Sequence, residues 1–155
     1  MDGIRTTTVS PLEAHLGYWL RLVSNEVSSA FARAIEERGM TVGEWVVLRL
    51  LFDREKQTLS DVARLTGMTR GAISKILDKL EVKALIARAQ NPDDSRVQWL
   101  SLTRSGRRLV PDLAATADSN DAHFFGALSQ RERDALSHAL EKLSRVHGFR
   151  SVPVD

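Results

Sequence analysis

The sequence of 155 residues predicts a mainly α-helical single domain with one small β-hairpin. Three observations support this fold class. Apolar residues recur at helical spacing for about seven turns between Leu12 and Ile35. Two shorter helical segments meet at Gly67, and two short strands, 85–89 and 97–102, follow them. The expected order is a long helix, three shorter helices, a hairpin and two further helices.

Capping residues set the expected boundaries of the first two helices. Ser10 and Pro11 supply a hydroxyl cap and a first-turn proline, so the long helix is expected to start there and to end at Gly39. Thr41 and Glu44 have the spacing of a capping box, which opens the second helix.

The next two helices are bounded in the same way. Thr58 is placed to cap a short helix that runs to about Thr66. Gly67 permits a left-handed turn, and Thr69 caps the following helix, which continues to about Lys83.

The hairpin and the C-terminal helices complete the fold. Residues 91–94, Asn-Pro-Asp-Asp, favour a type I turn between the strands. A helix is expected to begin near Ser105, with Pro111 in its early part causing a kink or a later start. Residues 129–132 form a second capping box, and Gly148 ends the last helix.

Composition restricts the class of protein. Apolar residues make up 43% and charged residues 27%, as in ordinary soluble domains, and no apolar run approaches the roughly 18 residues of a membrane span. The N-terminal segment lacks the apolar core of a secretion signal. No cysteine is present, which excludes disulfides and thiolate metal sites. A cytoplasmic protein without membrane contact is the expectation.

Positive charge is concentrated in the middle of the chain. Residues 41–110 carry 13 Lys and Arg against 8 Asp and Glu, a balance of +5, whereas the remainder carries 9 against 12. Such an accumulation suits phosphate binding, although a solvated charged surface would look the same.

The helix pair around Gly67 has the pattern of a helix-turn-helix that binds duplex DNA. Ala63 is small enough for the two helices to cross closely, and Gly67 follows four residues later. An amphipathic helix pair with a polar outer face is the structural alternative. The residues expected to be exposed on the second helix are Thr69, Arg70, Gly71, Ser74, Lys75 and Asp78.

The side chains of this second helix suit contact with a major groove. Arg70 can donate two hydrogen bonds to a guanine, and Ser74 and Lys75 can reach bases or phosphates. Gly71 would allow close approach to a thymine methyl group or to the DNA backbone.

A basic hairpin directly after a recognition helix is typical of a winged helix. Arg96, near the hairpin tip, could enter a narrow minor groove, where the negative potential favours arginine. Asp94 is placed to hold the Arg96 side chain by an ion pair. An exposed turn with incidental charges is the alternative.

The chain resembles transcriptional regulators of the multiple antibiotic resistance regulator (MarR) family. The residues that carry the resemblance are LGYWLR at 16–21, the helix-turn-helix, Asp94-Ser95-Arg96 in the wing, Leu100-Ser101-Leu102-Thr103, and Gly106. The similarity extends from about residue 10 to residue 148.

The resemblance implies a homodimer that binds a pseudo-palindromic operator in double-stranded DNA, usually as a repressor. Within the single domain 1–155, residues 41–104 would form the winged-helix DNA-binding lobe, and residues 10–40 and 105–149 the interlocking dimerisation helices. Independently of the resemblance, the last helix carries an apolar stripe that a protomer of this size need not bury internally. Its members are Leu136, Leu140, Leu143, Val146 and Phe149.

Similar regulators often bind a small aromatic or phenolic effector between the dimer helices and the DNA-binding lobe. The resemblance makes His15, Trp19, Trp45 and Arg49 the candidates here, since tryptophan and arginine can stack on and pair with an anionic ring. Core tryptophans with a surface arginine are the structural alternative. Without cysteine, the thiol-based peroxide sensing of some relatives is excluded.

Other functions have less support in the sequence. No HExxH motif, glycine-rich phosphate loop or nucleophile elbow is present, so an enzyme is not expected, and no cofactor is implied. His138 and Glu141 share a helix face, but no third metal ligand is evident. The remaining alternative is a winged-helix module for protein–protein contact without DNA binding.

Overall fold

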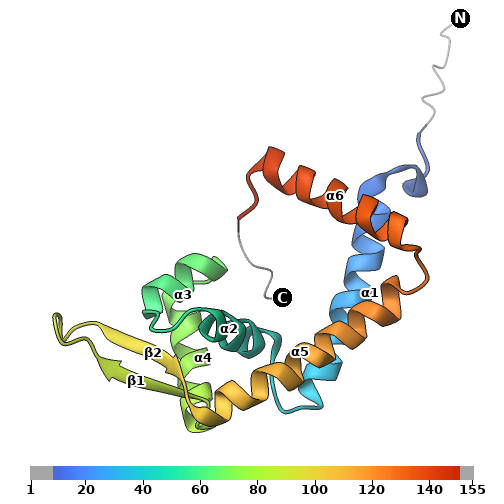
Figure 1. The fold of residues 1–155 in the computed structure, drawn as a ribbon. Helices are drawn as coiled ribbons and strands as arrows, with labels where there is room; N and C mark the ends of the chain where they lie inside the picture. Colours follow the sequence, from blue (N-terminus) through green and yellow to red (C-terminus); the bar gives the residue numbers. More distant parts are fainter. Residues whose placement is uncertain (1–8, 151–155) are drawn as a thin grey trace, which may run out of the picture.

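The computed structural model describes residues 9–150 of the chain (Figure 1). The elements, in order, are a 3₁₀ turn at Leu12–Ala14, α1 Leu16–Glu36, α2 Val42–Asp53, α3 Leu59–Thr66, α4 Arg70–Val82, β1 Ile86–Gln90, β2 Gln98–Leu102, α5 Arg104–Phe125 and α6 Gln130–His147. This order confirms the predicted mainly α-helical fold with a single hairpin.

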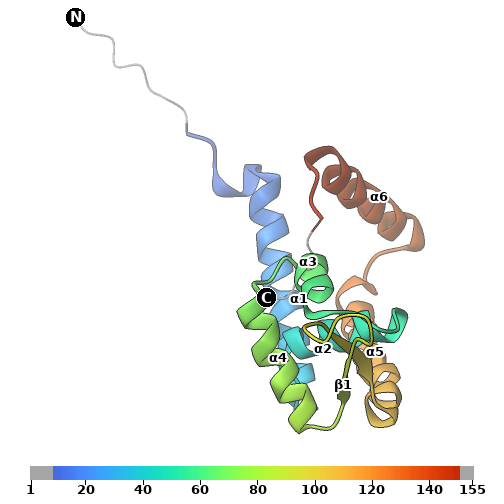
Figure 2. The ribbon, with the colours of Figure 1, turned by 90° about the vertical axis from the view of Figure 1, so that its left-hand side faces the viewer.

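A compact lobe and a helical arm make up the protomer (Figure 1). The lobe contains α2, α3, α4 and the β1–β2 hairpin. The long helices α1 and α5 pack against each other and lead away from the lobe towards α6. Figure 2 looks onto the lobe, with α3, α4 and the hairpin on the near side.

The start of the first helix differs from the prediction. Ser10 and Pro11 do not open one continuous helix: a single 3₁₀ turn comes first, and His15 has an extended backbone (φ −99°, ψ 126°) before α1 begins. The indole Nε1 of Trp19 donates to the carbonyl oxygen of Glu13 at 2.9 Å, which holds the turn against α1. Gly39 does stop the helix, in a left-handed conformation (φ +73°), as expected.

The helix-turn-helix matches the prediction closely. Thr58 caps α3 through a capping box with Asp61, and Gly67 adopts the left-handed conformation (φ +72°). The Thr69 hydroxyl accepts from the backbone N–H of Ala72 at 3.2 Å and so caps α4.

The hairpin is antiparallel, with Ile86 opposite Leu102 and Gln90 opposite Gln98. Each strand begins one residue later than predicted. Thr103 caps α5, which therefore starts slightly before Ser105. Pro111 lies inside α5 and does not delay its start, because Arg104 already belongs to the helix.

The hydrophobic core lies in the lobe. It joins α2 to α3, α4, the hairpin and the first half of α5, so the recognition helix and the wing have a common support. Leu65 and Ile76 are only partly buried. The side chains with almost no exposed surface include Ile35, Val47, Leu48, Leu51, Val62, Ile73, Leu77, Leu80, Leu100, Val110 and Leu113.

Among the helices that the structure describes, none combines the length and apolar character that a membrane crossing requires.

Candidate nucleic-acid interface

The N-terminal half of α4 presents the predicted base-reading residues to solvent. Thr69, Arg70, Gly71 and Lys75 are exposed, whereas Ser74 is partly buried. Within residues 9–150, neither Arg70 nor Lys75 takes part in an ion pair. Both cations are therefore available to an external anion such as a DNA phosphate or a guanine edge.

The predicted ion pair at the wing tip is present. Arg96 donates to Asp94 from Nε at 3.1 Å, from Nη2 at 3.3 Å and from its backbone N–H at 3.0 Å. The Arg96 side-chain hydrogen bonds, followed by the backbone one, hold the pKa of Asp94 below its usual value. The Arg96 side chain is still 88% exposed, so it is oriented but remains accessible.

Arg70 and Arg96 lie on the same groove. It has a volume of about 480 Å³ and runs between α3, α4 and the hairpin. Sequence reasoning missed several of the polar residues that line it, namely Thr58, Ser60, Arg88 and Gln98. The groove thus brings the recognition helix and the wing together around one basic, polar surface.

Arg88 on β1 ties the hairpin to the recognition helix. Its Nη2 lies 2.6 Å from Oδ1 of Asp78, and its Nε lies 3.0 Å from Oε2 of Glu81. The Arg88 side chain is only 18% exposed. The pairing compensates two acidic groups beside the proposed DNA surface. Asp78 is exposed, as the helical pattern predicted, and it is paired with Arg88. The only signal in the sequence was an arginine within a short strand.

The four candidate effector residues fall into two groups. His15 and Trp19 lie at the start of α1, on the part of the arm next to α6, whereas Trp45 and Arg49 lie on α2 in the lobe. Trp45 packs against the core as one of its partly buried members. Within one protomer, the structure does not bring the four residues to one pocket.

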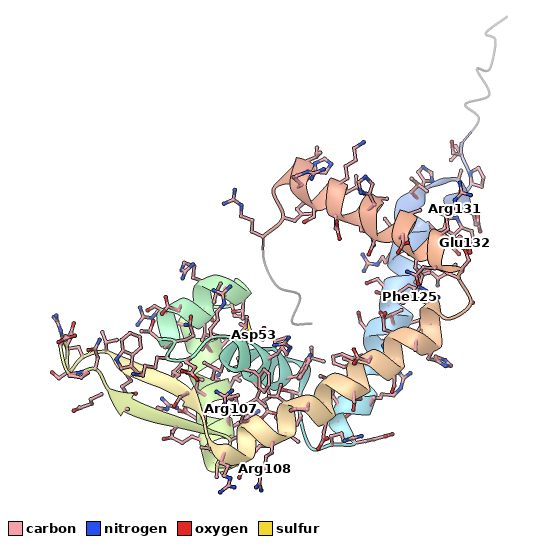
Figure 3. All side chains as sticks on the ribbon, viewed as in Figure 1. Asp53, Arg107, Arg108, Phe125, Arg131 and Glu132 are labelled. Atoms are coloured by element: carbon pink, nitrogen blue, oxygen red, sulfur yellow. The ribbon has the colours of Figure 1, made fainter. Side chains whose placement is uncertain are left out.

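Arg49 already has partners at the junction between α2 and α5. It pairs with Asp53 at 2.5 Å, and its guanidinium lies 5.8 Å from the centre of the Phe52 ring. Arg107 approaches the same ring at 5.5 Å. Figure 3 labels Asp53 and Arg107 at this junction.

A second groove, between α1 and α6, is apolar. It has a volume of about 550 Å³, and Trp19 is the only effector candidate that lines it. Leu20 and Val23 contribute from α1, and Phe125, labelled in Figure 3, closes the end near the α5–α6 turn. No residue of α6 is buried, which confirms that its apolar stripe is not covered within the protomer.

Among residues 9–150, no group of three or more His, Cys, Asp or Glu side chains is arranged to hold a metal ion.

A helix-turn-helix whose recognition helix adjoins an arginine-tipped hairpin defines a winged-helix DNA-binding protein. Comparison with known proteins gives the family. The MarR family model matches residues 40–97, and the chain belongs to this family of transcriptional regulators.

Three similar proteins illustrate the relationship. The HTH-type transcriptional regulator YkoM of Bacillus subtilis (strain 168) is 30% identical over 116 residues, which is 75% of each chain. The structure of Bordetella bronchiseptica BpsR, described with regulation of its DNA binding by 6-hydroxynicotinic acid, is 27% identical, with a TM-score of 0.76 over 88% of this chain and 98% of that one. The S. aureus MepR–DNA complex is 25% identical, with a TM-score of 0.75 over 85% and 98%. These relationships favour a DNA-binding regulator over a winged-helix module that only contacts proteins.

Proposed function

We propose that the protein represses transcription by binding, as a homodimer, a pseudo-palindromic operator in double-stranded DNA. The observation that carries the proposal is the shared groove, in which Arg70 of the recognition helix and Arg96 of the wing lie on one surface. Both guanidinium groups are exposed, and the MepR relative was crystallised with DNA.

The N-terminal turn of α4 is suited to the major groove. Arg70 would read a guanine, Ser74 and Lys75 would contact bases or phosphates, and Thr69 and Gly71 would lie against the DNA backbone. Arg96, oriented by Asp94, would enter the flanking minor groove.

The homodimer is proposed from the uncovered apolar surface of the arm. Leu16, Trp19, Leu20 and Val23 of α1 are exposed, and so is the leucine stripe of α6. Contiguous apolar surface of this kind is rarely left open on a monomer. A second copy packed through residues 10–40 and 105–149 would cover it and place two lobes about a two-fold axis.

Release by a small aromatic effector is a further part of the proposal. Regulation of DNA binding by 6-hydroxynicotinic acid is described for the BpsR relative. His15 and Trp19 of one protomer would meet Trp45 and Arg49 only across the dimer or after a change in the arm. Titration with aromatic carboxylates, followed by tryptophan fluorescence, tests this part separately.

A gel shift at graded salt concentrations tests DNA binding. Because each phosphate contact releases counterions, the affinity of the wild type should fall steeply as salt rises. Lys75→Ala should weaken binding and reduce the salt slope by about one. Lys79→Ala, which alters an exposed lysine one turn later, is the matched control and should leave the slope unchanged. A complex that is insensitive to salt, or no complex at all, would overturn the proposal in favour of a protein–protein module.

A further inference from the structure

The C-terminal end of the recognition helix α4 contacts both connections between the lobe and the arm. On one side, Nζ of Lys83, the residue that caps α4, donates to the carbonyl oxygen of Gly39 at 2.8 Å, in the turn between α1 and α2. On the other side, the Thr103 hydroxyl donates to the carbonyl oxygen of Ala84 at 2.7 Å, just before α5. The Thr103 N–H also donates to the carbonyl oxygen of Leu85 at 3.0 Å.

Lys83 has a second partner that is buried. Its Nζ lies 2.9 Å from both carboxylate oxygens of Glu44, whose side chain is only 1% exposed. Oε2 of Glu44 also accepts from the backbone N–H of Thr41 at 2.8 Å. Lys83 therefore joins the turn between α1 and α2, the first turn of α2 and the end of α4 through one ammonium group.

Only the Glu44 end of this ion pair is buried, because the Lys83 side chain is 37% exposed. Burial of the carboxylate costs desolvation energy, so the pair contributes less to net stability than its short distances suggest. The charged pair fixes geometry, because three acceptor oxygens hold the ammonium group of Lys83 in one position.

We propose that Lys83 is a positioning residue, which sets the angle of the recognition helix relative to the arm and thereby the separation of the two recognition helices in the dimer. The inference rests on the proposed homodimer. It assigns to Lys83 and Glu44 a role in DNA recognition although neither faces the basic groove.

The length of α4 explains why a small change at Lys83 matters. The helix has 13 residues and is therefore about 20 Å long, with Arg70 at the opposite end. A rotation of about 10° at Lys83 would move Arg70 by about 3 Å, which is close to the rise of one base pair. If both recognition helices of the dimer moved by this distance, the second helix would no longer align with its half-site.

Spin-label distance measurements on the dimer test this role. The chain has no cysteine, so Lys75→Cys introduces a single labelling site on the exposed face of α4. Lys83→Met combined with Glu44→Gln removes both charges and retains an oxygen that can accept from Thr41. Lys79→Met, on the same helix, is the matched control. Lys83→Ala alone is measured in parallel in case the double variant does not fold.

We expect one narrow inter-label distance in the otherwise unaltered protein and in the Lys79→Met control. In the double variant, and in Lys83→Ala, the distance should broaden or shift by about 2 Å or more. Lys83→Arg, which keeps the charge, should restore a narrow distribution. An unchanged distribution in folded Lys83→Ala or in the folded double variant would overturn the role of Lys83 alone. The absence of any inter-label distance in every variant would overturn the homodimer and, with it, this inference.

Discussion

Replacing Gly106 with alanine should loosen the joint between the wing and α5. Gly106 is buried in the first turn of α5. A Cβ atom added there would lie 2.1 Å from the carbonyl oxygen of Leu85 and 3.0 Å from its carbonyl carbon. Ordinary carbon–oxygen contacts are about 3.3 Å or longer, so α5 and the start of β1 would have to separate by about 1 Å.

The cost follows from what that separation breaks. The same Leu85 oxygen accepts from the Thr103 N–H, and the Thr103 hydroxyl donates to Ala84. Loss of two hydrogen bonds costs about 2 kcal/mol, and overpacking costs about 1–3 kcal/mol. The higher helix propensity of alanine returns up to about 1 kcal/mol. The net destabilisation should therefore be about 2–4 kcal/mol.

Urea unfolding at a fixed protein concentration measures the effect, since the stability of a dimer depends on concentration. Gly71→Ala is the matched control, because a Cβ at this exposed helical position would have no atom within 4 Å. The control should gain about 0.5–1 kcal/mol of stability. If the free energies of unfolding of Gly106→Ala and Gly71→Ala differ by less than about 0.5 kcal/mol, α5 is not closely packed against Leu85.

Three further predictions concern the wing, the end of α4 and the cap of α3. Arg96→Ala should weaken operator binding in a gel shift. The urea midpoint should not change, because the Arg96 side chain is 88% exposed. Operator binding at wild-type strength would contradict the role of Arg96 in the wing. Ala84→Gly should raise the free energy of unfolding by about 0.5–1 kcal/mol, because Ala84 has φ +56° and glycine avoids most of that strain; a lower urea midpoint would count against this. Hydrogen bonds from Thr58 hold the pKa of Asp61 below its usual 3.8. The stabilisation of the fold by ionised Asp61 is therefore complete above the unfolded-state pKa of this carboxyl group, and it is lost as pH falls through the folded-state pKa. Asp61→Ala should accordingly lose less stability on acidification than the wild type does. Urea unfolding of both proteins from neutral pH to about pH 3 measures this, and an equal decrease in the free energy of unfolding for the two proteins would contradict it.

The parts of the fold that were predictable depend on local interactions. The caps at Thr58, Thr69 and Ser129 each use a side chain that bonds to a backbone N–H three residues away. The left-handed turns at Gly67 and Gly148 depend on the residue itself. Such signals survive in the sequence because no distant partner is needed.

The first helix shows where local signals fail. A hydroxyl followed by proline is a good helix start, yet the chain makes one 3₁₀ turn and then extends at His15. The hydrogen bond from Trp19 to Glu13, across six residues, is part of what holds that turn. At the end of α4, the left-handed residue is Ala84, so no glycine marked the turn.

Only the solvent-exposed residues of the candidate site were predictable from the sequence. The α4 residues and the pairing of Asp94 with Arg96 follow from helical spacing and from neighbours two residues apart. The pairing of Lys83 with Glu44 joins residues 39 positions apart, and Arg88 reaches Asp78 from another element. One sequence does not specify such contacts, because they depend on how the elements pack.

Footprinting of the operator tests whether a dimer reads DNA through α4. The probe is a duplex enriched by the wild-type protein from a random-sequence pool. We expect two equivalent protected half-sites related by two-fold symmetry, with centres separated by about 34–36 Å or a multiple of it. Arg70→Ala should lose both half-sites together. A single asymmetric footprint, or two half-sites that persist in Arg70→Ala, would contradict the claim that a dimer reads DNA through α4.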